Sequence, residues 1–177
     1  MNAPNKQDNI AEYLLYMWQI EDLLRVYELD MDKIEKNLIA PMNLSEEDAK
    51  EARDWYEGLI LMMKSENVQH DGHLQVNKNI LIDLTDAHLR LLNNPQESAY
   101  IATYYKTLPH IVALRAKSEK KDVPELETCL TALYGYLLLK LQKKEISAET
   151  QQAVEQIRNL LRLLAEKYKT IDKEEIE

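Results

Sequence analysis

The sequence IAEYLLYMWQIEDLLRVYE, residues 10–28, places its apolar side chains three or four positions apart. An α-helix repeats every 3.6 residues, so this spacing gathers those side chains on one face. Tyr16 and Trp18 widen the face well beyond one stripe, and such a helix needs neighbours on more than one side. We therefore expect a packed helix over residues 9–28, capped by Asp8.

The same spacing recurs to the end of the chain and predicts further helices, which cover residues 30–40, 45–66, 73–92, 94–117, 122–144 and 147–168. All of these except the helix over residues 73–92 begin near a side chain that can accept hydrogen bonds from the free N–H groups of a first turn. The expected caps are Asp30, Ser45, Asn94, Asp122 and Ser147. Pro95 is expected at the first position of the helix that Asn94 caps.

Two of these helices carry distinctive features. Pro109 lies in the middle of its helix, lacks an N–H group and clashes with the preceding turn, so we expect a kink or break near Thr107. The helix over residues 122–144 is apolar on nearly every side from Leu126 to Leu141. We therefore expect it to be the central helix of the fold.

Candidate core residues lie on the repeating apolar faces. On three of the helices they are Trp55, Leu59, Met62 and Met63; Ile80, Leu81, Leu84, Ala87 and Leu91; and Val154, Ile157, Leu161, Leu164 and Tyr168. Glycine is scarce, with 3 in 177 residues, and no strand-like alternation persists beside the helical period. We predict an all-α fold, a single-domain bundle of six or seven helices with largely antiparallel up-down packing.

No linker or repeat divides the chain. The predicted organisation is a flexible N-terminus over residues 1–8, one helical-bundle domain over residues 9–168, and a flexible acidic tail over residues 169–177.

The charge balance indicates which partners to expect. Lys and Arg number 22 and Asp and Glu number 31, so the net charge is −9, with most of the excess acid in the first 70 residues. Nucleic acids and anionic membranes are both bound through clusters of basic side chains, so we expect neither as a partner. The longest near-apolar run, residues 129–139, is about half the ~20 residues that a membrane-spanning helix needs.

Several chemistries lack their characteristic residues. Cys129 is the only cysteine, which excludes an internal disulfide and a four-cysteine zinc site and favours a reducing compartment. The first residues contain no apolar signal-peptide segment, and we expect a cytoplasmic protein. The chain also lacks a Glu-x-x-His pair, a P-loop, and the G-x-S-x-G and G-x-G-x-x-G motifs. We therefore predict no cofactor and no catalytic residue.

His70 and His73 are three positions apart and could share a metal ion on a tight loop. A metal site needs three or four ligands, and no other cluster visibly supplies them. A polar loop that holds two histidines is the simpler interpretation, and no metal ligand is predicted.

Low-ranking pocket candidates come from polar residues on apolar faces. His88 falls among leucines on its helix, where it is either a core histidine bonded to a carboxylate or tyrosine, or a general base or ligand contact. Glu21 lies near an apolar face four residues before Arg25, which suggests a partly buried ion pair or a polar site inside the bundle. The chain has 10 tyrosines and no phenylalanine; Tyr104 and Tyr134 are the tyrosines that could join such a pocket.

Four stretches resemble a small bacterial family that is known only as a domain of unknown function. They are IAEYLLYMWQIEDLLR (residues 10–25), GHLQVNKNILIDLTDAHLRLL (72–92), YYKTLPHIVALRAK (104–117) and PELETCLTALYGYLLLKLQKKEIS (124–147). The resemblance implies a stand-alone, intracellular helical protein. It implies no activity, cofactor or site residue.

Two functions remain open at this point. The first is a non-enzymatic protein-interaction module, which binds another protein or itself through surplus aromatic and Met surface. The alternative is a small-molecule- or metal-binding enzyme with a pocket between helices around His88, where Glu21, Arg25 and a tyrosine would converge.

Overall fold

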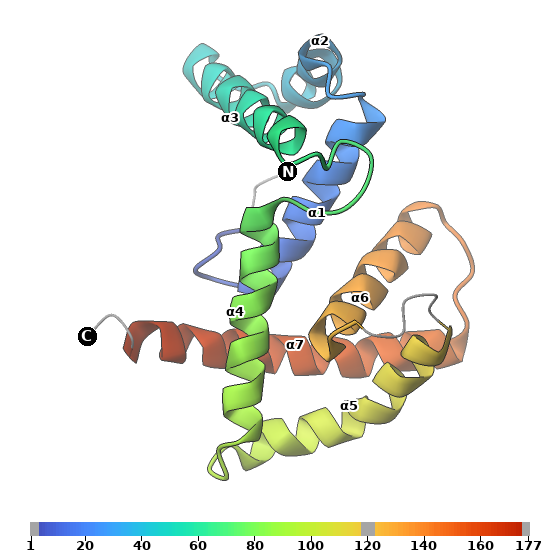
Figure 1. Ribbon diagram of the computed structural model, residues 1–177. Helices are drawn as coiled ribbons and strands as arrows, with labels where there is room; N and C mark the ends of the chain where they lie inside the picture. The colour runs from blue at the N-terminus through green and yellow to red at the C-terminus, as the bar shows by residue number, and fades with distance from the viewer. Residues whose placement is uncertain (1–3, 118–122, 175–177) are drawn as a thin grey trace. The chain divides into compact units, whose positions relative to one another are not determined.

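The computed structural model describes residues 4–117 and 123–174, with side chains through residue 170. Within these residues the fold is all-α, as predicted, and contains no strand (Figure 1). The helices are α1 (Ile10–Val26), α2 (Met31–Ile34), α3 (Glu46–Ser65), α4 (Gln75–Leu92), α5 (Ser98–Lys117), α6 (Glu125–Leu141) and α7 (Ala148–Glu174). A π-helical turn, η1 (Glu35–Ile39), and a 3-10 turn, η2 (Ala40–Met42), follow α2.

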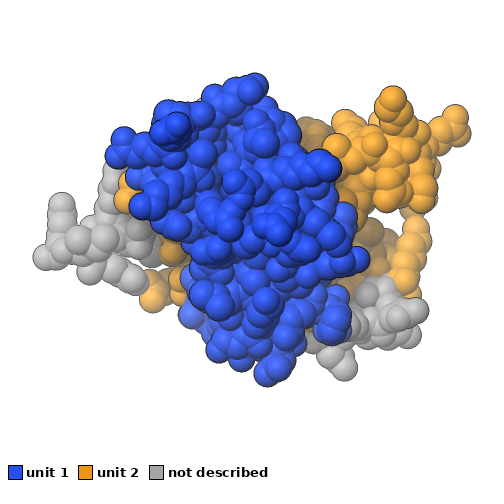
Figure 2. All heavy atoms as spheres, turned by 90° about the horizontal axis from the view of Figure 1, so that it is seen from above, with its two compact units in different colours: residues 1–3, 16–79 blue, residues 4–15, 80–177 orange. Residues whose placement is uncertain are grey.

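The chain forms two compact units (Figure 2). Among the described residues, Tyr16–Asn79 belong to unit 1, whereas Pro4–Leu15 and the chain from Ile80 onward belong to unit 2. The long helices α1 and α4 each contribute residues to both units. No glycine- or proline-rich linker marks these boundaries, and the prediction of a single domain remains a prediction.

In unit 1, α3 packs against α2 and η1. In unit 2, α5 and α7 pack together and α6 packs against both. The unit 1 core includes Leu24, Ile34, Tyr56, Ile60, Met63 and Leu74, and the unit 2 core includes Leu84, Tyr100, Ile111, Leu126, Leu130, Ile157 and Leu164.

Three predicted caps are confirmed. The Asp30 side chain accepts hydrogen bonds from the N–H groups of Asp32 and Lys33 at the start of α2. Ser45 caps α3, and the Ser147 hydroxyl oxygen accepts from the Thr150 N–H at the start of α7. Asp122 lies outside the described residues, and α6 begins after Pro124, which provides no side-chain cap.

Two predicted helix starts are wrong. Asn9, not Asp8, caps α1, because the Asn9 side chain accepts the Glu12 N–H. Pro95 is not at the first position of α5 but in the preceding turn, where the Asn94 carboxamide accepts the Gln96 N–H. The cap of α1 lies one residue later than predicted, and the proline lies in the turn before α5 instead of in its first turn.

The helix with Pro109 runs without a break from Ser98 to Lys117, and Figure 1 shows it bending along its length. The Thr107 hydroxyl donates to the Thr103 carbonyl, a bond that stays inside the helix. Of the expected kink or break, the break is absent, and the bend of α5 agrees with the kink.

The prediction that α6 is the central helix is wrong for its second half. Leu126, Cys129 and Leu130 are at most 1% exposed, but Leu138 is 36% and Leu141 is 67% exposed. On α3 the predicted core residues Trp55 and Met62 are likewise each 40% exposed, since Tyr56 and Ile60 point inward instead. The local periodicity of apolar residues predicts the helices, but it does not predict which faces of each helix pack against other helices.

Helix ends differ from prediction by a few residues. α1 stops at Val26 because Glu28 and Leu29 adopt left-handed backbone angles. α4 begins at Gln75 rather than residue 73, and α6 ends at Leu141 rather than residue 144. The backbone of α7 continues to Glu174, into the stretch predicted as a flexible tail.

Candidate functional site

The first polar cluster lies in unit 1 around Glu21, which is 1% exposed. Its Oε1 accepts hydrogen bonds from the Leu74 N–H at 2.9 Å and from the Asn77 amide at 2.7 Å. Its Oε2 lies 2.5 Å from His73 Nδ1, and the His73 ring stacks on Trp18 with centroids 4.4 Å apart. Both carboxylate oxygens are therefore occupied by groups at the start of α4.

Arg25 does not pair with Glu21. Its guanidinium bonds to Asp22 at 2.7 Å and to the carbonyls of Val68 and Gly72 at 3.1 and 2.5 Å. Gly72 has φ +81°, a left-handed angle that suits glycine. Arg25 thus holds the connection before α4 against α1. It does this next to Glu21, the acid that it was expected to pair with.

The Glu21 cluster acts as a clamp rather than a pocket. A helix start leaves N–H groups without partners, and a buried carboxylate that accepts one of them is both a cap and a favourable charge for the helix dipole. Glu21 supplies this function from α1 to α4 across 53 positions of sequence. Its role is to fix α4 on α1 within unit 1.

The second polar cluster lies in unit 2 around His88, which is 3% exposed. His88 Nδ1 lies 2.6 Å from the Tyr100 hydroxyl, while Nε2 lies 3.9 Å from Glu125 Oε2 and has no hydrogen-bond partner. The Tyr104 hydroxyl donates to the same Glu125 oxygen at 2.8 Å. Two tyrosines and a carboxylate therefore surround the histidine.

Burial sets the protonation states in this cluster. Desolvation lowers the pKa of His88, and the nearby Glu125 carboxylate opposes this only in part. Burial raises the pKa of Tyr100 and, with the hydrogen bond to Glu125, raises that of Tyr104 to about 12. We assign Tyr100 as the donor to Nδ1, which places the proton of neutral His88 on Nε2, facing the carboxylate.

The predicted pocket residues do not form one set of contacts. Glu21 and Arg25 belong to unit 1, His88 and Tyr104 to unit 2, and each makes the contacts described above inside its own unit. Tyr134 is half-buried on α6. The sequence indicated that Glu21 and His88 needed polar partners, but it missed Leu74, Asn77, Tyr100 and Glu125, because these partners come from other elements.

The paired histidines belong to different environments. His70 is exposed on the connection before α4, whereas His73 stacks on Trp18 and meets Glu21. Within residues 4–117 and 123–170, no group of three or more His, Cys, Asp or Glu side chains is arranged to hold a metal ion. Cys129 is fully buried, and burial raises its pKa to about 12, so its thiol is a poor nucleophile.

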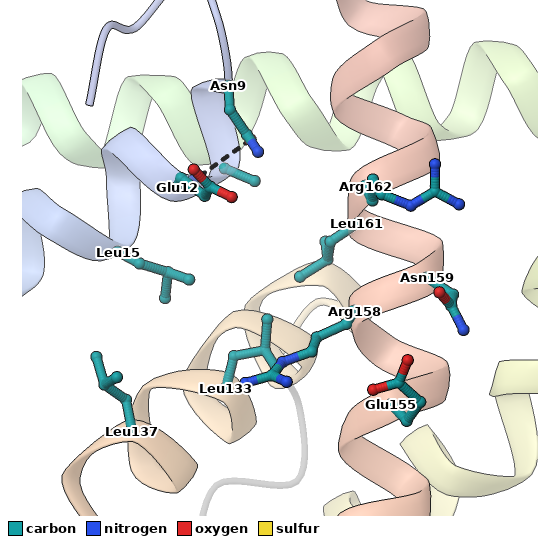
Figure 3. Close-up of a pocket in the computed structure, with 11 residues that line it drawn as sticks. Asn9, Glu12, Leu15, Leu133, Leu137, Glu155, Arg158, Asn159, Leu161 and Arg162 are labelled. Carbon is teal, nitrogen blue, oxygen red and sulfur yellow. Dashed lines mark hydrogen bonds between the residues drawn. The ribbon is translucent and has the colours of Figure 1, made fainter. Parts of the chain in front are cut away.

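Unit 2 also carries an open groove of about 640 Å³ between α1, α6 and α7. Leu15, Leu133, Leu137 and Leu161 face this hollow from the three helices (Figure 3). Its polar lining consists of Asn9, Glu12, Glu155, Arg158, Asn159 and Arg162. We call these residues together the α1–α6–α7 groove.

Sequence reasoning did not find this groove. The sequence feature that points to the groove is the all-round apolar character of α6, from which the sequence analysis predicts a central, buried helix. Leu133, Leu137 and Leu141 follow one another at intervals of four and form a ridge along one side of α6. Leu133 and Leu137 line the groove, and Leu141 is 67% exposed.

In the part of the chain that the structure describes, the helices carry two buried polar clusters and an open groove lined by leucines and polar side chains. The family model for a domain of unknown function, DUF4924, matches residues 1–175, and the chain belongs to this family. No curated protein and no solved structure matches the chain. No helix in the described part of the chain is both long and apolar enough to cross a membrane.

Proposed function

We propose that this chain is a non-enzymatic protein-interaction module that binds its partner through the α1–α6–α7 groove. The observation that carries the proposal is the end of α6, where Leu138 is 36% and Leu141 is 67% exposed, directly after Leu133 and Leu137, which line the groove. Single exposed leucines are ordinary, but a continuous apolar ridge next to an apolar hollow is typical of a binding surface.

The composition of the groove and its surroundings favours a protein partner. A ridge of leucines along one helix, flanked by arginine and acidic side chains, has the apolar centre and polar rim of a protein interface.

Site-specific crosslinking tests this proposal. Leu141 is replaced by the photoreactive residue p-benzoyl-phenylalanine in cells that natively express the chain, and crosslinked products are identified by mass spectrometry. We expect one discrete crosslinked species, because the side chain at 141 is 67% exposed and lies one helical turn beyond Leu137, which lines the groove.

Leu61 on α3 provides the matched control, since it is also 67% exposed but belongs to unit 1. A product at position 141 that the Leu61 variant does not give supports the proposal. Equal labelling at both positions, or none at 141, contradicts it.

A second function, small-molecule binding at His88, is favoured by one specific observation. The buried Nε2 of His88 has no hydrogen-bond partner, and a group with a hydroxyl or amide could bond to Nε2 and to Glu125, 3.9 Å away. Native mass spectrometry of the purified chain and of His88→Gln tests this. A bound mass present only in the wild type supports a ligand site, and bare chain mass in both variants contradicts it.

A further inference from the structure

The charge of the α1–α6–α7 groove differs from that of the whole chain. The chain carries a net charge of −9, so two copies repel one another at long range. The groove lining holds two acids, Glu12 and Glu155, and two arginines, Arg158 and Arg162, and is formally neutral. This face lets a second acidic chain approach without further repulsion.

This face also carries both a hollow and an exposed apolar side chain. In a two-fold contact the same patch serves both copies, so each projection must fit a hollow of the same patch. Leu133 and Leu137 line the groove, and Leu141, one helical turn further along α6, is 67% exposed. In a two-fold contact the exposed Leu141 of each copy would enter the groove of the other.

Glu155 and Arg158 carry the electrostatic part of this match. They lie three positions apart on one side of α7 and line the groove, and both are exposed (Figure 3). In the described part of the chain neither forms an ion pair with its own chain, although the Arg158 guanidinium lies over the Tyr136 ring, 5.2 Å from its centroid. A stacked guanidinium keeps its N–H edges free for a carboxylate.

Resting on the proposed function, we propose that the partner in the groove is a second copy of this chain, joined by two reciprocal Glu155–Arg158 pairs. In this contact the apolar residues of α6 supply most of the affinity. The Glu155–Arg158 pairs of α7 fix how the two copies are aligned. Association then requires opposite charges at 155 and 158 of the two copies.

Charge reversal tests the assignment, because loss of either side chain's contribution to folding would not be repaired by mixing the two variants. Glu155→Arg gives a chain with arginine at both positions, and Arg158→Glu gives a chain with glutamate at both. Each variant alone places like charges opposite one another, whereas an equimolar mixture places opposite charges at both contacts. The quantity measured is molar mass by light scattering during gel filtration, with folding checked by circular dichroism.

We expect the wild type to show twice the mass of one chain at micromolar concentration. Each variant alone is expected to dissociate, with the dimer dissociation constant raised about tenfold or more, and the mixture to regain the dimer mass. A monomeric wild type, variants that dimerise as well as the wild type, or a mixture that stays monomeric each overturns the inference. A crosslink from position 141 to a different protein would overturn the self-association while leaving the interaction function supported.

Discussion

Glu21 is the one acidic residue in the described chain that is buried, and it makes three contacts with residues that start α4. A buried acceptor that loses its charge leaves neighbouring donors poorly satisfied. In Glu21→Gln the amide oxygen can still accept from the Leu74 N–H and the Asn77 amide, but the acceptor is neutral and the NH₂ group needs His73 Nδ1 as an acceptor, so the charge-assisted bonds are lost. We expect the free energy of unfolding in urea to fall by about 1–3 kcal/mol.

Glu66 supplies the control for this measurement. Its carboxylate also accepts a backbone N–H at the start of α4, that of Gln75 at 2.6 Å, but it is exposed. We expect Glu66→Gln to change stability by no more than about 0.5 kcal/mol. Equal losses of unfolding free energy in the two variants would show that burial is not the reason why Glu21 stabilises the fold.

His88 makes the stability of the fold depend on pH. Burial lowers its pKa in the folded chain, while the unfolded chain takes up a proton near the ordinary value of about 6.5. The unfolded state therefore binds more protons below pH 6.5, and the free energy of unfolding falls with falling pH until the folded pKa is reached. The expected slope from this one group is at most about 1.4 kcal/mol per pH unit.

Urea unfolding at pH 7.5 and 5.5 measures this contribution. His88→Gln is expected to lose less stability than the wild type between the two pH values, because it removes the histidine while the carboxylates continue to titrate. His110→Gln, altered at a half-buried histidine of α5, is expected to keep the wild-type difference. A His88→Gln chain with an unchanged pH dependence would rule out this linkage.

Among the helices, α5 departs from the ordinary rules of helix formation because Pro109 lies inside it. This proline is exposed and leaves the Tyr105 carbonyl without the N–H that an ordinary residue would donate. Helix propensity favours alanine over proline by about 3 kcal/mol, and the greater freedom of the unfolded chain returns about 1 kcal/mol of that. We expect Pro109→Ala to raise the free energy of unfolding by about 1–2 kcal/mol.

Pro95 is the comparison, since it is also exposed but lies in the turn before α5. There a proline restricts the unfolded chain without breaking a helix, so Pro95→Ala is expected to lower stability by less than about 1 kcal/mol. If Pro109→Ala lowers stability instead, the bend of α5 is required for its packing on α7.

The same elements show which parts of the fold local rules predict. The caps at Asp30, Ser45 and Ser147 follow from hydrogen bonds within one turn, and the sequence predicts them correctly. The exposure of Trp55 and of Leu141 depends on which other helices pack against each face of their helix. The spacing of residues along one helix does not contain that information. For the same reason the sequence singled out Glu21 and His88 as polar residues in need of partners but did not predict the groove.

At the scale of the whole molecule, the shared helices govern how the two units unfold. α1 and α4 are continuous helices that contribute to both units, so melting either unit shortens helices on which the other depends. Helix formation is cooperative, and a helix end without its packed face is marginal in water. We expect the chain to unfold in one transition rather than two.

The chain carries a natural probe for each unit. Both tryptophans, Trp18 and Trp55, belong to unit 1, and Cys129, which is fully buried, belongs to unit 2. Tryptophan fluorescence and the reactivity of the thiol toward a disulfide reagent, measured across one urea series, are expected to change at the same midpoint. In the described chain, unit 1 consists of α1 after Leu15, α2, the two turns η1 and η2, α3 and the start of α4. A fluorescence midpoint at lower urea would mean that unit 1 melts alone and that the continuity of α1 and α4 does not couple the units.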